Sequence, residues 1–449
     1  MNEYFVQKLN IKDVRDIKDF EIQLDDNERK HLIITGKNGC GKTSTLNEID
    51  TLLNKLMNNQ FAQISQHKRD IKNFQEVIKQ AYKNIENYQK QINTYTEQKN
   101  SLVENEQIKQ QIEANIQSYT SNIMNERNNI QSWENSIIQL QKQIDDFSKV
   151  ELIFSNQSKI YENIVNGKFI LAFFKAKRHN EPTIPQTPTK QAFQAKYQTT
   201  YELNKTFLQY LLNLKTEQAF AQIRNDSETV NSISLWFNQF EIRLKELFEK
   251  EDLKLQFDDK GFNFKIAYGN KSFGLNELSD GYSSLLAIVT ELILRMEAQS
   301  NKAYDMQGVV LIDEIETHLH VELQKKVLPF LTGFFPKIQF VVTTHSPFVL
   351  SSLSNAVICD LEKRIVTSDL SAYSYDALVE SYFDSDKYSS EIKEKIKKFE
   401  ELSQKSELEG IEKDEYMEIK RFFKTLPTFR ADELAVKIKE ILRNDVHKG

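Results

Sequence analysis

A glycine-rich octapeptide is the feature that most constrains how this chain can fold. It reads Gly36-Lys37-Asn38-Gly39-Cys40-Gly41-Lys42-Thr43 and fits the pattern G-x-x-x-x-G-K-[ST]. The apolar residues 31–35 before it predict a buried strand, and residues 44–49 after it predict the start of a helix. Glycines let the backbone N–H groups approach an anion, and the helix N-terminus adds partial positive charge. We therefore predict a phosphate-binding loop, which fits this context better than a chance glycine-rich turn.

The chemistry of such a loop resides in two side chains. Lys42 is expected to reach the β- and γ-phosphates of a nucleotide, and Thr43 to hold Mg²⁺ through its hydroxyl group. The expected cofactors are ATP and Mg²⁺. The predicted nucleotide-binding residues of this segment are Gly36, Lys37, Asn38, Gly39, Cys40, Gly41, Lys42, Thr43 and Ser44.

A pair of carboxylates follows an apolar run far downstream. Residues 308–312 predict a buried strand that ends at Asp313 and Glu314. We predict Asp313 as a residue of the Mg²⁺ shell and Glu314 as the general base for the attacking water. The alternative is a strand end capped by two exposed acids, which the phosphate loop upstream makes the weaker interpretation.

Two further segments could complete a nucleotide site. The apolar run 340–342 predicts a strand that presents His345, whose imidazole can hydrogen-bond the γ-phosphate. A structural histidine is the alternative. Ser279 and Gly281 precede an apolar helix over 285–296, and this helix start is a second candidate anion site.

The segment between the phosphate loop and residue 166 lacks glycine and proline, which permits very long helices. Isoleucine recurs every seven residues at Ile64, Ile71, Ile78, Ile85 and Ile92, and on a new phase at Ile116, Ile123, Ile130, Ile137 and Ile144. Two heptad arms with a polar break predict an antiparallel helical hairpin with its tip within Thr96–Gln111. Each arm of about 32 residues would be about 48 Å long. A globular helical bundle and one helix of an intermolecular coiled coil are the alternatives.

Composition narrows the class of protein. The 449 residues carry a net charge of −6, which gives no global indication of nucleic-acid binding. Neither Cys40 nor Cys359 has a partner at C-x-x-C spacing, so we expect a reducing, cytoplasmic environment. We find no secretory signal pattern and no apolar run long enough to span a bilayer.

The order of these motifs resembles the ABC-type ATPase head shared by RecF-like, SbcC-like and SMC-like proteins. It looks closest to the bacterial AAA-type ATPases of that group that serve phage defence, as in Septu (PtuA-type), PARIS (AriA-type) and retron-associated systems. The resemblance covers residues 1–45 and about 165–355. It implies a homodimer or higher homo-oligomer in which Ser279 and Gly281 of one subunit face ATP bound by another.

The sequence also departs from this family's pattern. Asp280 stands where transport ATPases usually have glycine, and Tyr282 where they usually have glutamine. The glutamine that usually senses Mg²⁺ has no clear counterpart, although Gln186 and Gln191 are candidates. Arg15 lies where a residue of such nucleotide-binding domains can contact the base or ribose of the nucleotide. The alternative is a solvated charge in a loop.

The predicted fold class is α/β: an ABC-type P-loop ATPase head with an inserted antiparallel helical coiled-coil hairpin and a helical C-terminal tail. The predicted parts are 1–50 and 151–360 for the head, 51–150 for the hairpin and 361–449 for the tail. Within the head, 191–250 is expected to be helical and 253–266 to form a β-hairpin. Tail helices are expected at Tyr388–Ser403, Glu412–Lys424 and Asp432–Leu442.

These observations predict a cytoplasmic ATPase that acts as a sensor or scaffold controlling a separate effector, a nuclease or toxin, in phage defence. No nuclease motif is evident in the chain itself. The alternatives are a DNA-repair or DNA-end-processing ATPase that binds DNA, a transporter subunit, and an ATP-binding scaffold without turnover. The long helical insertion argues against the transporter.

Overall fold

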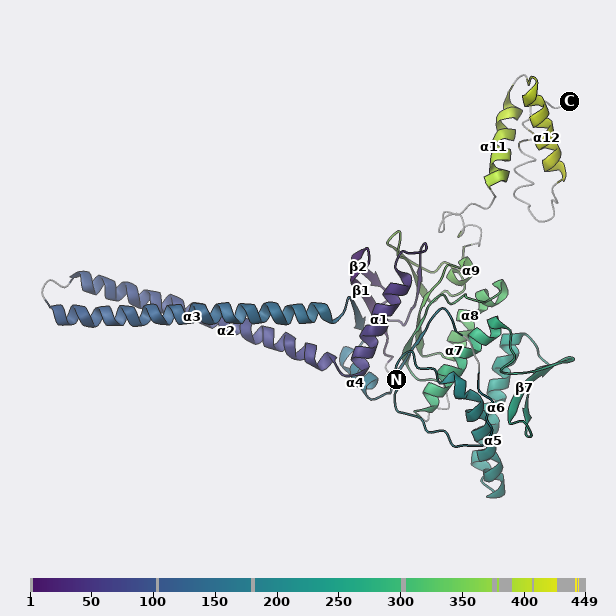
Figure 1. The fold of residues 1–449 in the computed structure, drawn as a ribbon, viewed down its shortest axis with the longest axis horizontal. Helices are drawn as coiled ribbons and strands as arrows, with labels where there is room; N and C mark the ends of the chain where they lie inside the picture. Colours follow the sequence, from purple (N-terminus) through teal and green to yellow (C-terminus); the bar gives the residue numbers. More distant parts are fainter. Residues whose placement is uncertain are drawn as a thin grey trace. The chain divides into compact units, whose positions relative to one another are not determined.

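The computed structural model describes residues 3–101, 105–178, 182–299, 304–373, 390–405 and 408–425, together with 378, 441 and 443. The chain separates into two compact units, 1–372 and 373–449 (Figure 1). All of the candidate site residues lie in the first unit.

A six-stranded sheet in the order β12-β11-β3-β10-β9-β5 forms the centre of the first unit. Its strands are β3 (His31–Thr35), β5 (Ile170–Phe174), β9 (Gly308–Ile312), β10 (Ile338–Thr343), β11 (Ala356–Asp360) and β12 (Ile365–Ser368). All of the pairings are parallel except that of β12 with β11. The parallel strands are buried almost throughout, as expected for a sheet covered on both faces. The strands expected at 31–35, 308–312 and 340–342 are thereby confirmed.

A second, antiparallel sheet has the order β2-β1-β4. It contains β1 (Val6–Val14), β2 (Ile17–Gln23) and β4 (Val150–Phe154), with α4 (Gln157–Val165) following. One hydrophobic core joins this sheet to the central sheet and to α1 (Lys42–Met57), the helix after the phosphate loop. The sequence analysis did not predict β4 and α4, which are short elements directly after a very long helix.

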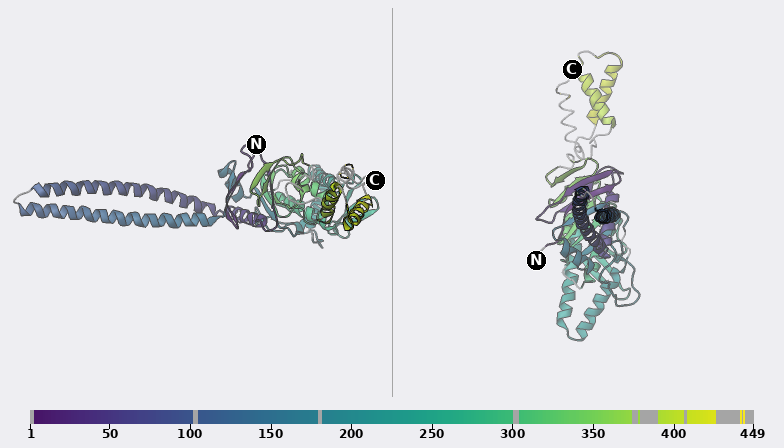
Figure 2. Two further views of the ribbon diagram at one scale, coloured as in Figure 1. Left: turned by 90° about the horizontal axis from the view of Figure 1, so that it is seen from above. Right: turned by 90° about the vertical axis from the view of Figure 1, so that its left-hand side faces the viewer.

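A helical hairpin is inserted between α1 and β4. It consists of α2 (Phe61–Ser101) and α3 (Glu106–Phe147), which lie along each other (Figures 1 and 2). With 41 and 42 residues, each helix is about 60 Å long, more than the expected 48 Å. Helix α2 ends and helix α3 begins within the expected tip region, and residues 102–104 between them lie outside the described part of the chain.

Side chains at the predicted heptad positions lie in the interface between α2 and α3. All of the heptad isoleucines are buried or half-buried. Glu126 of α3, which is half-buried, accepts a hydrogen bond from Asn84 Nδ2 of α2 at 2.9 Å. Tyr119 packs against both Tyr88 and Tyr95 from the facing helix. These contacts fix an antiparallel register.

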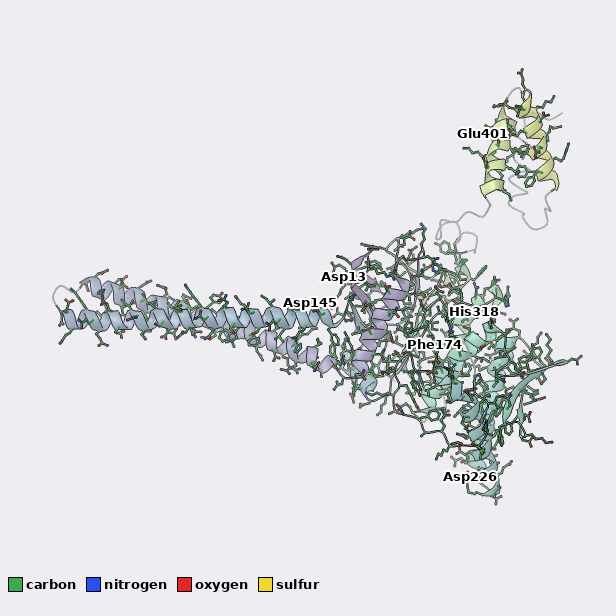
Figure 3. All side chains as sticks on the ribbon, viewed as in Figure 1. Asp13, Asp145, Phe174, Asp226, His318 and Glu401 are labelled. Atoms are coloured by element: carbon green, nitrogen blue, oxygen red, sulfur yellow. The ribbon has the colours of Figure 1, made fainter. Side chains whose placement is uncertain are left out.

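The remaining helices of the first unit are α5 (Phe207–Ile223), α6 (Ser227–Phe248), α7 (Asp280–Glu297), α8 (Val321–Phe334) and α9 (Pro347–Leu350), with a short 3-10 turn η1 at Asn204–Thr206. Asp226 caps α6 at its turn with α5, accepting a hydrogen bond from Thr229 N at 3.1 Å (Figure 3). A three-stranded sheet contains β6 (Lys254–Asp258), β7 (Asn263–Tyr268) and β8 (Lys271–Gly274), so the expected hairpin is confirmed and has a third strand.

The expectation of helix over 191–250 is wrong at its beginning, because residues 191–203 are irregular. A buried arginine explains this. Arg295 of α7 donates hydrogen bonds to the carbonyls of Gln198 (2.9 Å), Tyr201 (2.9 Å) and Leu171 (2.7 Å), and forms a buried ion pair with Glu291 (2.7 Å). The bonds to Gln198 and Tyr201 satisfy carbonyl groups of this segment that a helix would have paired within itself.

Replacing Arg295 with methionine is expected to lower the free energy of unfolding by about 3–5 kcal/mol, because it leaves the Glu291 carboxylate buried without its partner. Both side chains are only 4% exposed. A shift of the urea midpoint, monitored by circular dichroism, measures the effect. Lys159→Met, which removes a solvent-exposed ion pair with Glu162, is the matched control and should leave the midpoint nearly unchanged. Equal midpoints for the two variants would contradict the assigned role of Arg295.

The second unit contains α11 (Ser390–Gln404) and α12 (Ile411–Thr425), in agreement with the two tail helices expected there. Phe399, Tyr416 and Phe423 form its small core. The third expected helix, Asp432–Leu442, lies outside the described residues except for Ile441. The sheet of the head continues through β12 to Ser368, beyond the expected start of the helical tail at residue 361. In the part of the chain that the structure describes, no helix combines the length and apolarity needed to cross a membrane.

Candidate functional site

The phosphate loop connects the end of β3 to the start of α1, and its backbone requires glycine. Gly36 and Gly41 have φ values of +133° and +103°, in the region that L side chains rarely adopt. A Cβ atom at Gly36 would also lie 2.8 Å from Cys40 Sγ. The spacing of glycines in the sequence therefore corresponds to a real conformational demand.

Lys42 lies inside this loop. Its side chain is buried, and Nζ donates hydrogen bonds to the carbonyls of Gly36 (2.8 Å) and Lys37 (3.1 Å). Burial lowers the pKa of Lys42, while nearby groups, including the carboxylates of Glu314 and Asp313, oppose that shift. A cation is thus held at the centre of the loop, close to the two carboxylates predicted from the sequence.

Thr43 and Asp313 meet across the sheet edge. Thr43 Oγ1 lies 3.1 Å and 3.0 Å from the two carboxylate oxygens of Asp313, and Thr343 Oγ1 donates to Asp313 Oδ1 at 2.6 Å. A hydroxyl and a carboxylate oxygen are the hard donors that Mg²⁺ prefers. The residues present therefore fit the ion that the sequence analysis expected at this position.

Glu314 follows in a left-handed conformation, with φ of +44°. Its N–H donates to Thr343 Oγ1 at 2.8 Å, and its Oε2 accepts a hydrogen bond from Thr317 Oγ1 at 3.3 Å. A glutamate in this region of φ is uncommon and persists only where its surroundings hold it. The turn after β9 therefore fixes the direction of the Glu314 side chain.

Arg178 is a residue of this site that the sequence analysis missed. Its buried guanidinium donates to the carbonyls of Asp313 (2.9 Å), Glu314 (3.2 Å) and Ile315 (2.7 Å). Burial lowers its pKa to about 10. Three consecutive carbonyls after β9 are thereby held in place. No motif in the sequence marks Arg178, because its partners are backbone atoms about 135 residues away in the sequence.

His345 lies just beyond β10, and its backbone N–H donates a hydrogen bond to Glu316 Oε1 at 2.5 Å. Burial lowers the pKa of His345, and the Lys42 cation lowers it further, while Glu316, Glu314 and Asp313 oppose the shift. Because β3, β10 and β9 are neighbours in a parallel sheet, their carboxyl ends bring the phosphate loop, the two carboxylates and His345 to one edge. Two labelled side chains help to find this edge of the sheet in Figure 3: Phe174, at the end of β5, and His318, in the turn after Glu314.

The structure places Ser279 and Gly281 at the start of α7, beside the turn that follows Glu314. A Cβ atom at Gly281 would lie 3.0 Å from the carbonyl oxygen of His318 and 3.5 Å from Leu323. Tyr282, one of the departures from the family pattern, stacks on Phe248 with ring centroids 4.2 Å apart. Close packing of α7 explains why a small residue stands at 281 and an aromatic one at 282.

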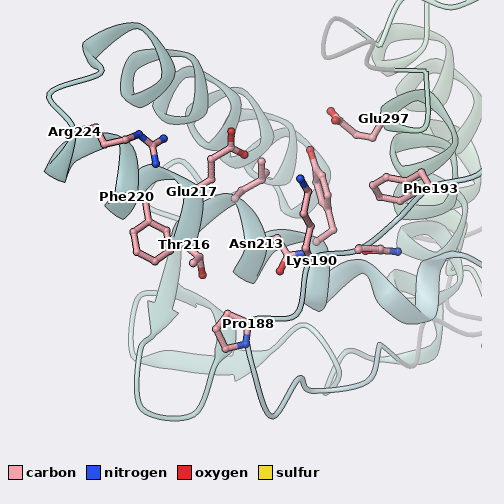
Figure 4. A pocket seen from close by; sticks show the side chains of 12 residues that line it. Pro188, Lys190, Phe193, Asn213, Thr216, Glu217, Phe220, Arg224 and Glu297 are labelled. Carbon is pink, nitrogen blue, oxygen red and sulfur yellow. The ribbon is translucent and has the colours of Figure 1, made fainter.

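The remaining candidates have separate surroundings. Gln191 donates to Thr206 Oγ1 at 2.6 Å and lines a cavity of about 480 Å³ with Phe193 and Tyr210, next to α5 (Figure 4). Gln186 is exposed. Arg15 has its Nη1 3.4 Å from the carbonyl oxygen of Gly39, so it contacts the phosphate loop. Among the described residues, neither Gln186 nor Gln191 makes a contact that would support a role in Mg²⁺ sensing.

A family model described as an AAA ATPase domain matches residues 5–350. The chain belongs to this AAA ATPase family. The match includes the phosphate loop, both carboxylates and His345, as well as the inserted hairpin.

Two relatives of this AAA ATPase come from named bacterial systems. The chain is 34% identical over 134 residues to the Septu protein PtuA of Bacillus mycoides (strain KBAB4), a match that covers 28% of this chain and 18% of that protein. It is 38% identical over 89 residues to the Retron Ec83 probable ATPase of Escherichia coli, covering 19% and 16%. The chain thus spans less than a fifth of the length of either relative. The expected relationship to Septu and retron ATPases is confirmed.

Among solved structures, the chain is similar to an Smc head domain with an extended coiled coil bound to the C-terminal domain of ScpA, derived from Pyrococcus furiosus. The sequence identity is 10%, the TM-score is 0.31, and the match covers 81% of this chain and 96% of that one.

Proposed function

We propose that this AAA ATPase binds ATP with Mg²⁺ at the edge formed by β3, β9 and β10 and hydrolyses it slowly. One observation carries the proposal: the Thr43 hydroxyl lies against the Asp313 carboxylate, next to the buried Lys42 of the phosphate loop. Thr43 and Asp313 would hold Mg²⁺, which neutralises phosphate charge when it is bound. Lys42 contacts the β- and γ-phosphates.

In this proposal, Glu314 is the general base that accepts a proton from the attacking water. Its fixed left-handed turn, stabilised by Arg178 and Thr343, would orient the carboxylate in advance of the reaction. His345 hydrogen-bonds the γ-phosphate and senses whether it is present. The loss of that contact after hydrolysis is the event that the protein would report.

Ser279 and Gly281 are proposed to complete the site of a second copy. The start of α7 offers backbone N–H groups to an anion, as helix N-termini do. Two ATP molecules would then be held between two heads, so ATP binding would drive the formation of a homodimer or a larger homo-oligomer.

The oligomer is proposed to act as a sensor or scaffold that holds or releases a separate effector, a nuclease or toxin, in phage defence. The similarity to a Septu protein and a retron ATPase supports this context. A test is the mass of the native complex, purified with its genomic neighbours, with and without ATP. A co-purifying nuclease or toxin would support the effector model. An ATP-dependent dimer with DNA and no protein partner would favour a DNA-repair ATPase instead.

Asp313→Asn is expected to raise the Mg²⁺ concentration that gives half-maximal ATP hydrolysis by about 10- to 100-fold, a typical loss when a group around a metal is altered. The substitution keeps the size of the side chain but removes the charge that attracts the ion. A Mg²⁺ titration at saturating ATP measures the shift. Asp305→Asn, which alters a surface ion pair with Lys337, is the control. An unchanged Mg²⁺ requirement for Asp313→Asn would exclude Asp313 from the metal site.

A further inference from the structure

Two segments at the edge of the central sheet are joined side by side: the end of β10 and the turn that runs from β9 to α8. Three hydrogen bonds connect these segments and the start of α8: Thr343 Oγ1 to Asp313 (2.6 Å), the backbone N–H of His345 to Glu316 (2.5 Å), and Ser346 Oγ to Gln324 of α8 (2.7 Å). The first pair belongs to the proposed metal site. The second links the proposed γ-phosphate sensor to a carboxylate that has no role so far.

The Glu316 carboxylate is only half satisfied. Its Oε1 accepts the hydrogen bond from the backbone N–H of His345. Its Oε2 is buried and accepts no hydrogen bond from any group in the described part of the chain. A buried acceptor without a donor costs free energy, so stability alone does not explain a glutamate here.

The surroundings of Glu316 are those of the nucleotide site. Its charge opposes the effect of burial on the pKa of Arg178, of His345 and of Lys42. Thr317, the next residue, donates to Glu314 Oε2 at 3.3 Å. One short turn therefore holds the proposed base through Thr317 and the proposed sensor through Glu316.

We infer that Glu316 is a positioning residue for ATP hydrolysis, which fixes the backbone of His345 so that its imidazole faces the γ-phosphate. The inference rests on the proposed function. Because the same turn carries Glu314, Glu316 keeps the sensor and the base at a constant separation. This positioning depends on the place of one acceptor oxygen, whereas the negative charge acts separately, on the pKa values of His345 and Lys42.

Two conservative variants separate position from charge. Glu316→Gln keeps the length of the side chain and an acceptor oxygen, whereas Glu316→Asp keeps the charge but shortens the reach by one methylene group. Steady-state ATP hydrolysis gives kcat and KM, and a fluorescent ATP analogue gives the dissociation constant. We expect Glu316→Gln to retain kcat within about threefold and Glu316→Asp to lose at least about tenfold. The dissociation constant should stay within about threefold for both, which also shows that both variants are folded.

A double-mutant cycle tests whether Glu316 acts through His345. Glu316→Ala combined with His345→Ala is expected to be no slower than His345→Ala alone, because the positioned group is already absent. Glu322→Ala, an exposed glutamate at the start of α8, is the matched control and should behave as the wild type. Additive losses in the cycle, or a kcat higher for Glu316→Asp than for Glu316→Gln, would overturn the inference alone. A wild-type protein that does not hydrolyse ATP would overturn the proposed function and this inference together.

Discussion

Replacing Glu314 with glutamine is expected to lower the rate of ATP hydrolysis by about 10²- to 10⁴-fold, the usual contribution of a general base. The amide cannot accept the proton of the attacking water. ATP binding should persist, because Lys42 and the glycine backbone of the loop are untouched. Single-turnover hydrolysis and an ATP-binding titration on the same sample measure the two quantities.

The Glu314→Gln variant should also accumulate as an ATP-bound oligomer, since the proposed assembly dissociates only after hydrolysis. Its mass in ATP and Mg²⁺, measured by light scattering, should exceed that of the nucleotide-free protein. Glu322→Gln, a neutral substitution at an exposed site, provides the comparison. Hydrolysis at the wild-type rate by Glu314→Gln would assign the base to another group.

Lys42→Ala is expected to raise the dissociation constant for ATP by more than about 100-fold. The ammonium would contact two phosphates, each charge-assisted hydrogen bond contributes about 1.5–3 kcal/mol, and every 1.4 kcal/mol is tenfold in affinity. Isothermal titration calorimetry with ATP measures the loss. The wild type must bind ATP in the same assay.

Lys90→Ala is the control for Lys42, because Lys90 lies on helix α2 of the hairpin, outside the nucleotide site, where its side chain is 68% exposed and pairs with Glu86. It should bind ATP nearly as the wild type does. The two lysines therefore distinguish a positioned cation from a general effect of positive charge. Identical oligomer masses for Lys42→Ala and Glu314→Gln in the presence of ATP would refute the switch model.

Sequence patterns within a few neighbouring residues predicted the phosphate loop and the two strands that lead to Asp313 and His345. Gly36 through Thr43, the strand before Asp313 and the strand before His345 each carry a pattern within a few residues. The heptads predicted the hairpin in the same way. In each case the physical signal is contained in one element, which is why one sequence was sufficient. The fold class came from the family that the order of these motifs resembles.

The sequence did not predict the roles of residues whose hydrogen-bond partners are backbone atoms far away in the chain. Arg178 donates to carbonyls of residues 313–315, and Arg295 holds an irregular segment that the sequence analysis expected to be helical. Thr343 and Glu316 likewise obtain their partners only when β10 and β9 pair. Such contacts depend on the tertiary arrangement, and neither periodicity nor motif spacing records them.

The base of the hairpin gives the long insertion a mechanical consequence. Lys55, near the end of α1, donates a hydrogen bond to the carbonyl of Phe147, the last residue of α3, while Phe61 at the start of α2 packs on Tyr161. The hairpin thus contacts the head at α1, the helix that begins with Lys42 and Thr43. Because the hairpin is about 60 Å long, rotating it by about 5° about its base would move its far end by about 5 Å. Under the proposed function, a displacement too small to disturb the packing of α1 would be amplified into one that a bound partner could register.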